Sequence, residues 1–290
     1  YTLKSEENKD SFYVGGTETE AFAKSYENDY AGNLWKVNTA NAVSTEYGYD
    51  DDKNVSTLKN ALNGLKLIYK YEYDDEGNIL SDKLRVGSGT EEDLLNSEPT
   101  QAVTYTYDEN NQLKTADYGN VSYEYIYDNS DDETAEFDHR GNITKKRVTT
   151  DGVAQTVEYV YDTQWKDKLI SYNGQTITYD VVGNPTNYLG HNLEWSFGRQ
   201  LTKFDTNTYT YNEDGIITSK TVNTVTTTYY LDGTNIIEQN DGTNTLHFYY
   251  DSNDEIIGFT YNEADYFYVK NAMSDIAGIV DNSGNLVVSY

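Results

Sequence analysis

Short stretches of alternating aromatic and polar residues follow one another along the chain, and most of them end in a cluster of aspartate, asparagine and glycine. Residues 69–73 read Tyr-Lys-Tyr-Glu-Tyr, which is the period of two that a β-strand requires. Residues 56–70 show a weak helical spacing, but the alternation beyond them favours strands, so we expect little helix. The pattern therefore predicts an all-β protein of short strands and tight turns.

The clearest example of the pattern is a nine-residue motif, Tyr-x-Tyr-Asp-x-x-Gly-Asn-aliphatic, at residues 71–79. Its two tyrosines point to one face of a strand because they are two residues apart. The aspartate starts a type I turn, since its carboxylate accepts hydrogen bonds from the backbone N–H groups that follow. Glycine three residues later supplies the left-handed conformation that closes a hairpin with a bulge. We interpret each copy as the turn of a β-hairpin.

Copies of this motif recur along the chain with varying fidelity. Asn111 occupies the glycine position of one copy, where asparagine is the best-tolerated replacement, and Lys53 occupies it in another, at a cost of about 1 kcal/mol. The residues that we assign to the repeat are Tyr71, Tyr73, Asp74, Gly77, Asn78, Tyr105, Tyr107, Asp108, Tyr125, Tyr127, Asp128, Asp138, Gly141, Tyr159, Tyr161, Asp162, Tyr179, Asp180, Gly183, Tyr209, Tyr211, Gly215, Asp251, Asp281 and Gly284.

The spacing of the copies predicts how they are organised. Aspartates of successive copies are often 18 to 21 residues apart. A unit of about 20 residues is one hairpin, which cannot bury a face alone and must stack on its neighbours. About a dozen copies imply roughly two dozen strands, and an open sheet of more than about 10 strands curls, splits or closes. We therefore expect residues 1–290 to form a single repeat domain, a long antiparallel sheet that curves or spirals, in which residues 1–25 match the repeat poorly.

Composition and charge exclude several function classes. The chain has 30 tyrosines beside 8 phenylalanines, and its 14% of aromatic residues argues against disorder. A formal charge of −28 argues against binding to nucleic acid or to an anionic membrane surface. The absence of cysteine excludes disulfide scaffolds and thiol catalysis. No run of residues is apolar enough for a membrane span. Because the chain begins at Tyr1, we expect it to be a fragment of a longer protein.

Carboxylates are the first candidates for chemistry. A glycosidase needs two of them, and residues 50–52 and 74–76 offer several, but these are the positions that the turns require. We therefore expect neither a catalytic residue nor a cofactor. Residues 128–133 form an oxygen-rich segment that would suit Ca²⁺, although the spacing is not that of an EF-hand loop. A solvated acidic loop is the preferred interpretation, and a calcium site is the alternative.

Histidine and tryptophan residues are the remaining candidates. His139, His191 and His247 show neither metal-binding spacing nor a nucleophile motif, and we expect structural roles for them. The tryptophans of this chain would either pack in the interior or stack on a sugar, and we prefer packing; they are Trp35, Trp165 and Trp195. We expect Trp195 to lie in the interior and the Arg199 guanidinium to lie over an aromatic face.

On these residues the chain resembles the RHS/YD-repeat family, which is represented in bacterial wall-associated proteins and in animal teneurins. Two further stretches carry the resemblance. Residues 193–201, Leu-Glu-Trp-Ser-Phe-Gly-Arg-Gln-Leu, are similar to the family's Trp-x-x-Gly-Arg-x-Leu element through Trp195, Gly198 and Arg199. Residues 266–290 are similar to the stretch that closes the RHS core. The resemblance covers nearly the whole chain and is weaker before Tyr26.

This resemblance implies a spiralling β-sheet that forms a hollow shell. In bacterial members the shell encloses a variable C-terminal toxin, used in contact-dependent competition or delivered by insecticidal toxin complexes. The family's self-cleavage segment and toxin follow the closing stretch, so neither activity is carried over to these residues. We expect an open arc of wall, without enzymatic activity, from a secreted or surface-exposed bacterial protein whose partner is its own toxin passenger. A carbohydrate-binding adhesin module is the alternative, and a glycosidase is the third.

Overall fold

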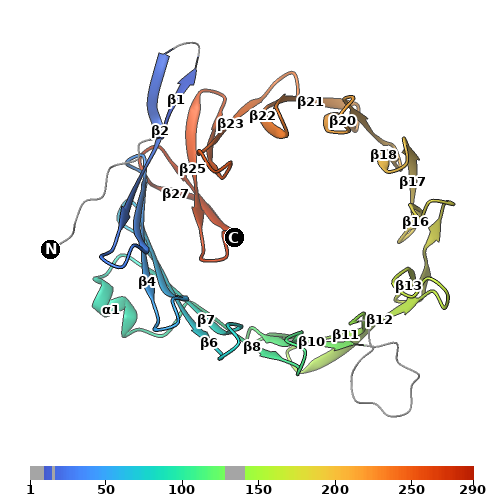
Figure 1. Ribbon diagram of the computed structural model, residues 1–290, viewed down its shortest axis with the longest axis horizontal. Helices are drawn as coiled ribbons and strands as arrows, with labels where there is room; N and C mark the ends of the chain where they lie inside the picture. Colours follow the sequence, from blue (N-terminus) through green and yellow to red (C-terminus); the bar gives the residue numbers. More distant parts are fainter. Residues whose placement is uncertain (1–9, 15–16, 128–140) are drawn as a thin grey trace. The chain divides into compact units, whose positions relative to one another are not determined.

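The computed structural model describes residues 10–14, 17–127 and 141–290, and nearly all of its regular elements are antiparallel β-strands (Figure 1). Strand order follows chain order, in one sheet from β1 to β14 and in another from β15 to β27. The predicted all-β class and the long antiparallel series of hairpins are thus confirmed. The chain divides into two compact units: unit 1 consists of Tyr1–Ala102 and Tyr229–Tyr290, and unit 2 of Val103–Thr228.

Unit 1 combines strands from the beginning and from the end of the chain. Their bounds are β1 (Asp10–Val14), β2 (Thr17–Asn28), β3 (Leu34–Thr39), β4 (Val43–Tyr49), β5 (Val55–Ala61), β6 (Lys66–Tyr73), β7 (Ile79–Gly87), β22 (Asn235–Asn240), β23 (Thr245–Tyr250), β24 (Ile256–Tyr261), β25 (Ala264–Lys270), β26 (Ile276–Asp281) and β27 (Leu286–Ser289). One short helix, α1 (Glu91–Leu95), follows β7, and the hydroxyl of Thr90 caps it by accepting a hydrogen bond from Asp93 N at 3.1 Å.

The core of unit 1 lies between its early and its late strands. Phe22 of β2 stacks on Tyr249 of β23, with 3.7 Å between the ring centroids, and contacts Phe267 of β25 at 4.9 Å. Leu58 of β5 and Val269 of β25 belong to the same buried cluster. The apolar faces of the early hairpins of unit 1 pack against those of its late hairpins. In Figure 1 the blue strands and the red strands of this unit accordingly lie side by side.

Unit 2 takes in the strands from β8 to β21, of which the first and the last also extend past its boundaries. Their bounds are β8 (Gln101–Tyr107), β9 (Leu113–Asp117), β10 (Val121–Tyr127), β11 (Ile143–Thr150), β12 (Val153–Tyr161), β13 (Leu169–Tyr172), β14 (Gln175–Thr176), β15 (Thr178–Tyr179), β16 (Pro185–Tyr188), β17 (His191–Ser196), β18 (Gln200–Phe204), β19 (Asn207–Tyr211), β20 (Ile217–Val222) and β21 (Val225–Asp232). Among its described apolar side chains, three are buried: Val103, Ala116 and Ile177.

A register shift accompanies the turns of the repeat. On β6 and β7, Glu72 pairs with Ser81 but Tyr73 pairs with Ile79, so Leu80 is an extra residue on the returning strand. The same shift occurs at the tyrosines that end β4, β8, β10, β12, β19 and β23. The hairpins therefore have the bulge that the motif predicts, and a bulge bends and twists the strand that contains it.

Candidate functional site

The turns of the repeat share one hydrogen-bond pattern, which Asp74 shows in full. Its Oδ1 accepts hydrogen bonds from Glu76 N at 3.2 Å and Asn78 N at 2.7 Å, and its Oδ2 accepts one from Asn78 Nδ2 at 2.9 Å. These bonds, above all the one from the Asn78 side chain, lower the pKa of Asp74. The same three bonds are made at Asp29, Asp50, Asp180 and Asp281. These carboxylates hold their own turns.

The fourth position of most turns of the repeat has a left-handed backbone. Gly77 has a φ of 85°, and the non-glycine residues Lys53 and Asn111 adopt 68° and 60° at the equivalent position. Side chains disfavour this region because their Cβ approaches the backbone, so Lys53 holds a strained conformation. Positive φ values are also found at Gly141, Gly183, Gly215 and Gly284.

Exchanging the residues of two turns should move stability in opposite directions. We expect Lys53→Gly to raise the free energy of unfolding by about 1 kcal/mol and Gly77→Lys to lower it by about the same amount. A Cβ at Gly77 would have no atom within 4 Å, so the loss would come from backbone conformation alone. Urea denaturation of both variants measures the two changes, and equal signs would contradict this account of the turn.

In several copies of the repeat, the tyrosine that precedes the turn connects that turn to the one before it. Tyr73 at the end of β6 donates its hydroxyl to the carbonyl oxygen of Val55, the first residue of β5, at 2.9 Å. Tyr127 donates to Leu113 O at 2.8 Å in the same way. Equivalent bonds join Tyr49 to Leu34, Tyr161 to Ile143, Tyr179 to Leu169, Tyr211 to Leu201 and Tyr250 to Ile236. Phenylalanine cannot make this bond, which gives a physical reason for the excess of tyrosine.

The other predicted repeat residues are distributed along the same strands. The first tyrosines of the pairs lie on β6, β8, β10, β12 and β19; they are Tyr71, Tyr105, Tyr125, Tyr159 and Tyr209. Asp108, Asp162 and Asp251 each accept hydrogen bonds from two backbone N–H groups of their own turns. Asp128, Asp138, His139 and the candidate calcium segment at 128–133 lie outside the described residues.

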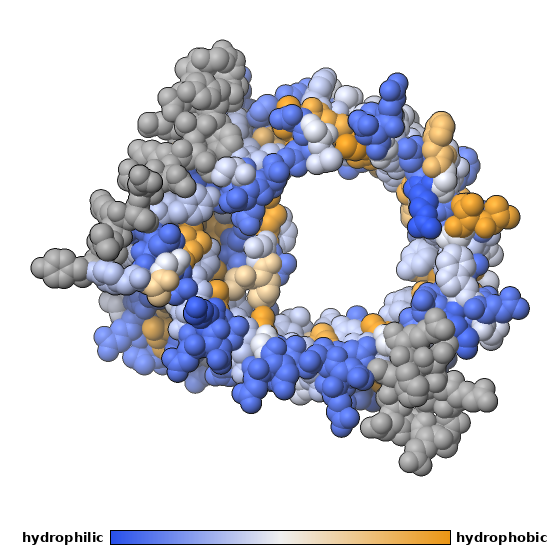
Figure 2. Space-filling model, in the orientation of Figure 1, coloured by the Kyte–Doolittle hydropathy of each residue, from blue (hydrophilic) through white to orange (hydrophobic). Residues whose placement is uncertain are grey.

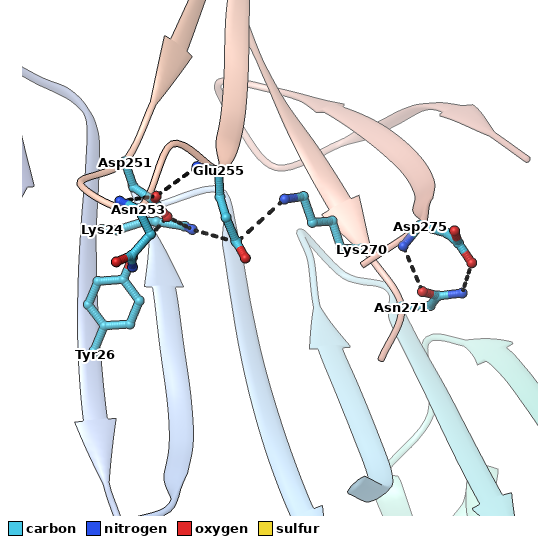
Figure 3. A network of polar contacts seen from close by, with 8 residues as sticks. All are labelled: Lys24, Tyr26, Asp251, Asn253, Glu255, Lys270, Asn271 and Asp275. Atoms are coloured by element: carbon cyan, nitrogen blue, oxygen red, sulfur yellow. Dashed lines mark hydrogen bonds and ion pairs between the residues drawn. The ribbon is translucent and has the colours of Figure 1, made fainter. Parts of the chain in front are cut away.

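A cavity of about 260 Å³ lies in unit 1 between β2–β4 on one side and β24, β25 and the turns that precede β24 and follow β25 on the other. A polar network borders it (Figure 3). Lys24 Nζ lies 2.7 Å from Asp251 Oδ2, and the Tyr26 hydroxyl donates to the same oxygen at 3.2 Å. Glu255 Oε2 lies 4.0 Å from Lys24 Nζ and 3.6 Å from Lys270 Nζ. Because two lysines meet two carboxylates, the network is balanced in charge and fixes β2 against the turn that follows β23.

This network was not predicted from the sequence, although the sequence contains a signal for it. In the complete copies of the turn, an asparagine four residues after the aspartate occupies Oδ2. Glu255 stands at that place after Asp251, so Oδ2 is available to Lys24 and Tyr26. The Asp251 side chain is almost completely buried, and its hydrogen bond with Lys24 keeps the pKa of this carboxyl low despite that burial.

Asp82 is the carboxyl group whose pKa is raised among the described residues. It lies on β7 opposite Tyr71, and burial raises its pKa to about 6. Tyr69 and Tyr71 stack 6.1 Å apart beside it, and burial raises the pKa of Tyr69 to about 12. No described group donates a hydrogen bond to Asp82 Oδ1. A glycosidase needs a second carboxylate that faces the first. Burial alone raises the pKa of Asp82, with no contribution from a neighbouring carboxylate.

The described histidines have acidic partners rather than metal-binding neighbours. His191 Nδ1 lies 2.7 Å from Asp205 Oδ2, and His247 Nδ1 lies 3.4 Å from Glu238 Oε2. Within the ranges that the structure describes, no group of three or more histidine and acidic side chains is arranged to hold a metal ion. The same ranges contain no helix with the length and apolar character of a membrane span.

The tryptophan and arginine residues lie in different environments. The indole N–H of half-buried Trp195 donates to Pro185 O at 2.7 Å. Gly198 and Arg199 lie in the exposed turn between β17 and β18, and the cation–π contacts found among the described residues involve lysines and not Arg199. Trp35 is half-buried, whereas Trp165 is 54% exposed with Lys168 Nζ 5.4 Å from its ring centroid.

Comparison with known proteins identifies relatives of this chain. It is 30% identical over 282 residues to the tRNA3(Ser)-specific nuclease WapA of Bacillus spizizenii and 31% identical over 282 residues to the tRNA nuclease WapA of Bacillus subtilis. Each match covers 92% of this chain and 11% of the relative. The chain thus spans about a tenth of the length of these curated relatives. No family model matches it.

Solved structures with the same fold are also found. The TcdB2-TccC3-Cdc42 crystal structure matches with a TM-score of 0.68 at 16% identity, over 97% of this chain and 16% of that one. A Photorhabdus luminescens Tc holotoxin pore matches with a TM-score of 0.64 at 16% identity, over 95% and 15%. The repeated tyrosine and aspartate turns, the WapA relatives and this shared fold agree: the chain belongs to the RHS/YD-repeat family.

Proposed function

We propose that this chain is a non-enzymatic wall segment of a β-shell which, in its parent protein, encloses and helps to deliver a C-terminal toxin. The observation that carries the proposal is the series of tyrosine hydroxyl bonds that join one turn to the preceding one in several copies of the repeat. Together with the strand ladders, these bonds make a sheet without gaps between successive hairpins in the segments where they occur. Such a sheet is suited to separate a passenger from its surroundings.

The relatives support a toxin as the passenger. WapA is named as a tRNA nuclease, and the chain covers about a tenth of it. The described residues of this chain supply turn carboxylates that are occupied by backbone N–H groups and one raised-pKa carboxyl, Asp82. We therefore assign the catalytic activity to another part of the parent, and we expect a secreted or surface-exposed bacterial protein.

Protease protection in the parent protein tests the proposal. Replacing Tyr127, Tyr161 and Tyr211 by phenylalanine removes three bonds between turns while the rings remain. We expect the passenger of this variant to be cleaved at least tenfold faster than that of the unmodified parent. The matched control replaces Tyr118 and Tyr230, which are 41% and 51% exposed, by phenylalanine and should leave protection unchanged.

Two results would contradict a passive wall. One is a passenger that is equally accessible to protease in the unmodified parent and in both variants. The other is hydrolysis of tRNA by the isolated 290-residue chain, because the proposal places no catalytic residue in it.

A further inference from the structure

The cavity of about 260 Å³ in unit 1 is lined by both apolar and charged side chains. Val37, Val43 and Ile257 supply apolar surface, and all three are buried residues. The charged side chains are those of the network in Figure 3, in which two lysines meet two carboxylates. Figure 2 likewise shows apolar residues next to hydrophilic ones where the early and the late strands of unit 1 meet. A ligand that fits this cavity therefore has an apolar part and a polar part.

The four charged side chains form two ion pairs of different kinds. Lys24 Nζ and Asp251 Oδ2 are 2.7 Å apart and their side chains are 12% and 1% exposed, so this pair is hydrogen-bonded and closed to a ligand. Lys270 Nζ and Glu255 Oε2 are 3.6 Å apart, which is longer than a hydrogen bond, and their side chains are 24% and 54% exposed. Charge-assisted hydrogen bonds of about 2.7–2.9 Å are stronger than such a contact. The Lys270–Glu255 pair can therefore exchange its contact for two shorter bonds to a ligand.

Two tyrosine hydroxyls of the same cavity also have unused hydrogen-bonding capacity. Tyr47 and Tyr268 line the cavity, and among the described residues no group forms a hydrogen bond with either hydroxyl. Burial raises the pKa of Tyr47, with a contribution from the nearby charge of Glu255, and burial raises the pKa of Tyr268 to about 12. Both hydroxyls therefore keep their protons at neutral pH and can donate a hydrogen bond to a ligand.

Size and charge balance together indicate the class of ligand. At about 30 Å³ for each water-sized group, the cavity has room for about nine non-hydrogen atoms. Its two positive and two negative side chains sum to zero, so an anion or a cation would bring an uncompensated charge into a partly buried site, whereas a zwitterion would not. A sugar would place hydroxyl groups against the apolar surface. An α-amino acid carries its ammonium and carboxylate groups on one carbon, so both groups reach an ion pair whose atoms are 3.6 Å apart.

We propose that this cavity binds a free α-amino acid with an aliphatic side chain, of about the size of leucine. The ligand carboxylate accepts hydrogen bonds from Lys270 Nζ and from a tyrosine hydroxyl, and the ligand ammonium group donates to Glu255. The aliphatic side chain of the ligand lies against Val43 and Ile257. Because strands from both ends of the chain line the cavity, a bound amino acid joins the early and the late strands and stabilises unit 1.

Isothermal titration calorimetry of the 290-residue chain with L-leucine and its analogues tests this proposal. Of the two analogues, 4-methylpentanoate lacks the ammonium group and 3-methylbutylamine lacks the carboxylate. We expect L-leucine to bind at one site with a dissociation constant below about 1 mM. Each analogue, and also glycine, should bind at least tenfold more weakly than L-leucine. Absence of saturable binding of L-leucine would overturn the proposal, and so would equal binding of L-leucine and either analogue.

Two variants identify which side chain meets which group of the ligand. Lys270→Gln should lower the affinity for L-leucine at least tenfold, so that L-leucine no longer binds better than 3-methylbutylamine. Glu255→Gln should lower it by a similar factor, so that L-leucine no longer binds better than 4-methylpentanoate. Both side chains are partly exposed, so the variants should retain the β-type circular dichroism spectrum.

The matched control removes another lysine–glutamate pair of unit 1 that does not line the cavity. Lys83 Nζ lies 3.1 Å from Glu72 Oε1, and the variant Lys83→Gln with Glu72→Gln should bind L-leucine as the unmodified chain does. An equal loss of affinity in this control would overturn the proposal, as would an affinity that neither cavity variant changes. Saturable binding of glucose in place of L-leucine would overturn it in favour of a carbohydrate ligand.

Discussion

Replacing Phe22 with alanine is expected to lower the free energy of unfolding of unit 1 by about 3–5 kcal/mol. Phe22 is 1% exposed and lies on an early strand, yet its ring contacts are made by two late strands. The variant would leave a cavity between Tyr249 and Phe267 that the sheets on either side cannot fill without moving together. Because unit 1 is formed by both ends of the chain, both ends should lose protection at once.

Hydrogen exchange measured by mass spectrometry resolves this expectation along the chain. Peptides from β2–β6 and from β23–β26 should exchange faster in Phe22→Ala, while peptides from β17–β20 in unit 2 should be unchanged. Tyr30→Ala is the matched control, since this tyrosine is 65% exposed and should change little. Faster exchange confined to the early strands would show that the two ends do not share one core.

Replacing Asp82 with asparagine is expected to stabilise the protein at pH 8 by about 1–2 kcal/mol and to change it little at pH 3.5. Burial raises the pKa of Asp82 from 3.8 to about 6, so the folded state binds a proton that the unfolded state releases between these values. The stability contributed by the protonated group is complete below about pH 4 and is lost as the pH rises through 6. In a site without water, this pKa shift would correspond to a larger change in the free energy of unfolding. The expected change is smaller because Asp82 is only partly buried and solvent screens its charge.

Urea denaturation from pH 3.5 to 8 measures the difference between the two proteins. The turn aspartates, whose pKa values are lowered, destabilise both proteins as the pH falls through those values, so their effect cancels in the comparison. Asp214→Asn, at an exposed turn position, is the control for replacing an acid by its amide. A difference for Asp82→Asn that does not change with pH would contradict a buried, proton-binding carboxyl.

The hairpins were predictable because their chemistry is local. Asp74 and Gly77 form their turn with bonds that span at most four residues, so spacing alone predicts them. The left-handed conformation of Lys53 was predictable for the same reason, from its position in the motif. Alternation of Tyr71 and Tyr73 likewise predicted which side chains share a face.

The long-range contacts were not predictable from one sequence. Phe22 meets Tyr249 across more than two hundred residues, and no periodicity indicates which hairpins pack face to face. Asp82 was overlooked because a carboxylate in β7 resembles any solvated residue until its neighbours Tyr69 and Tyr71 are known. The hydroxyl bonds of the tyrosines were also missed, since they depend on the bulge that brings each ring to the preceding turn.

Glu255 stands where the complete turns have asparagine, and this difference affects how the late strands align with β2 during folding. Hairpins of similar sequence can substitute for one another, and the late strands could slide by one whole hairpin relative to β2. After such a slip Lys24 would face Asn271, the residue that replaces aspartate in the next turn and carries no charge. The irregular turn at Asp251 therefore favours one alignment of the similar hairpins over the others. Correct assembly of the repeat thus depends on the position of its imperfect copy.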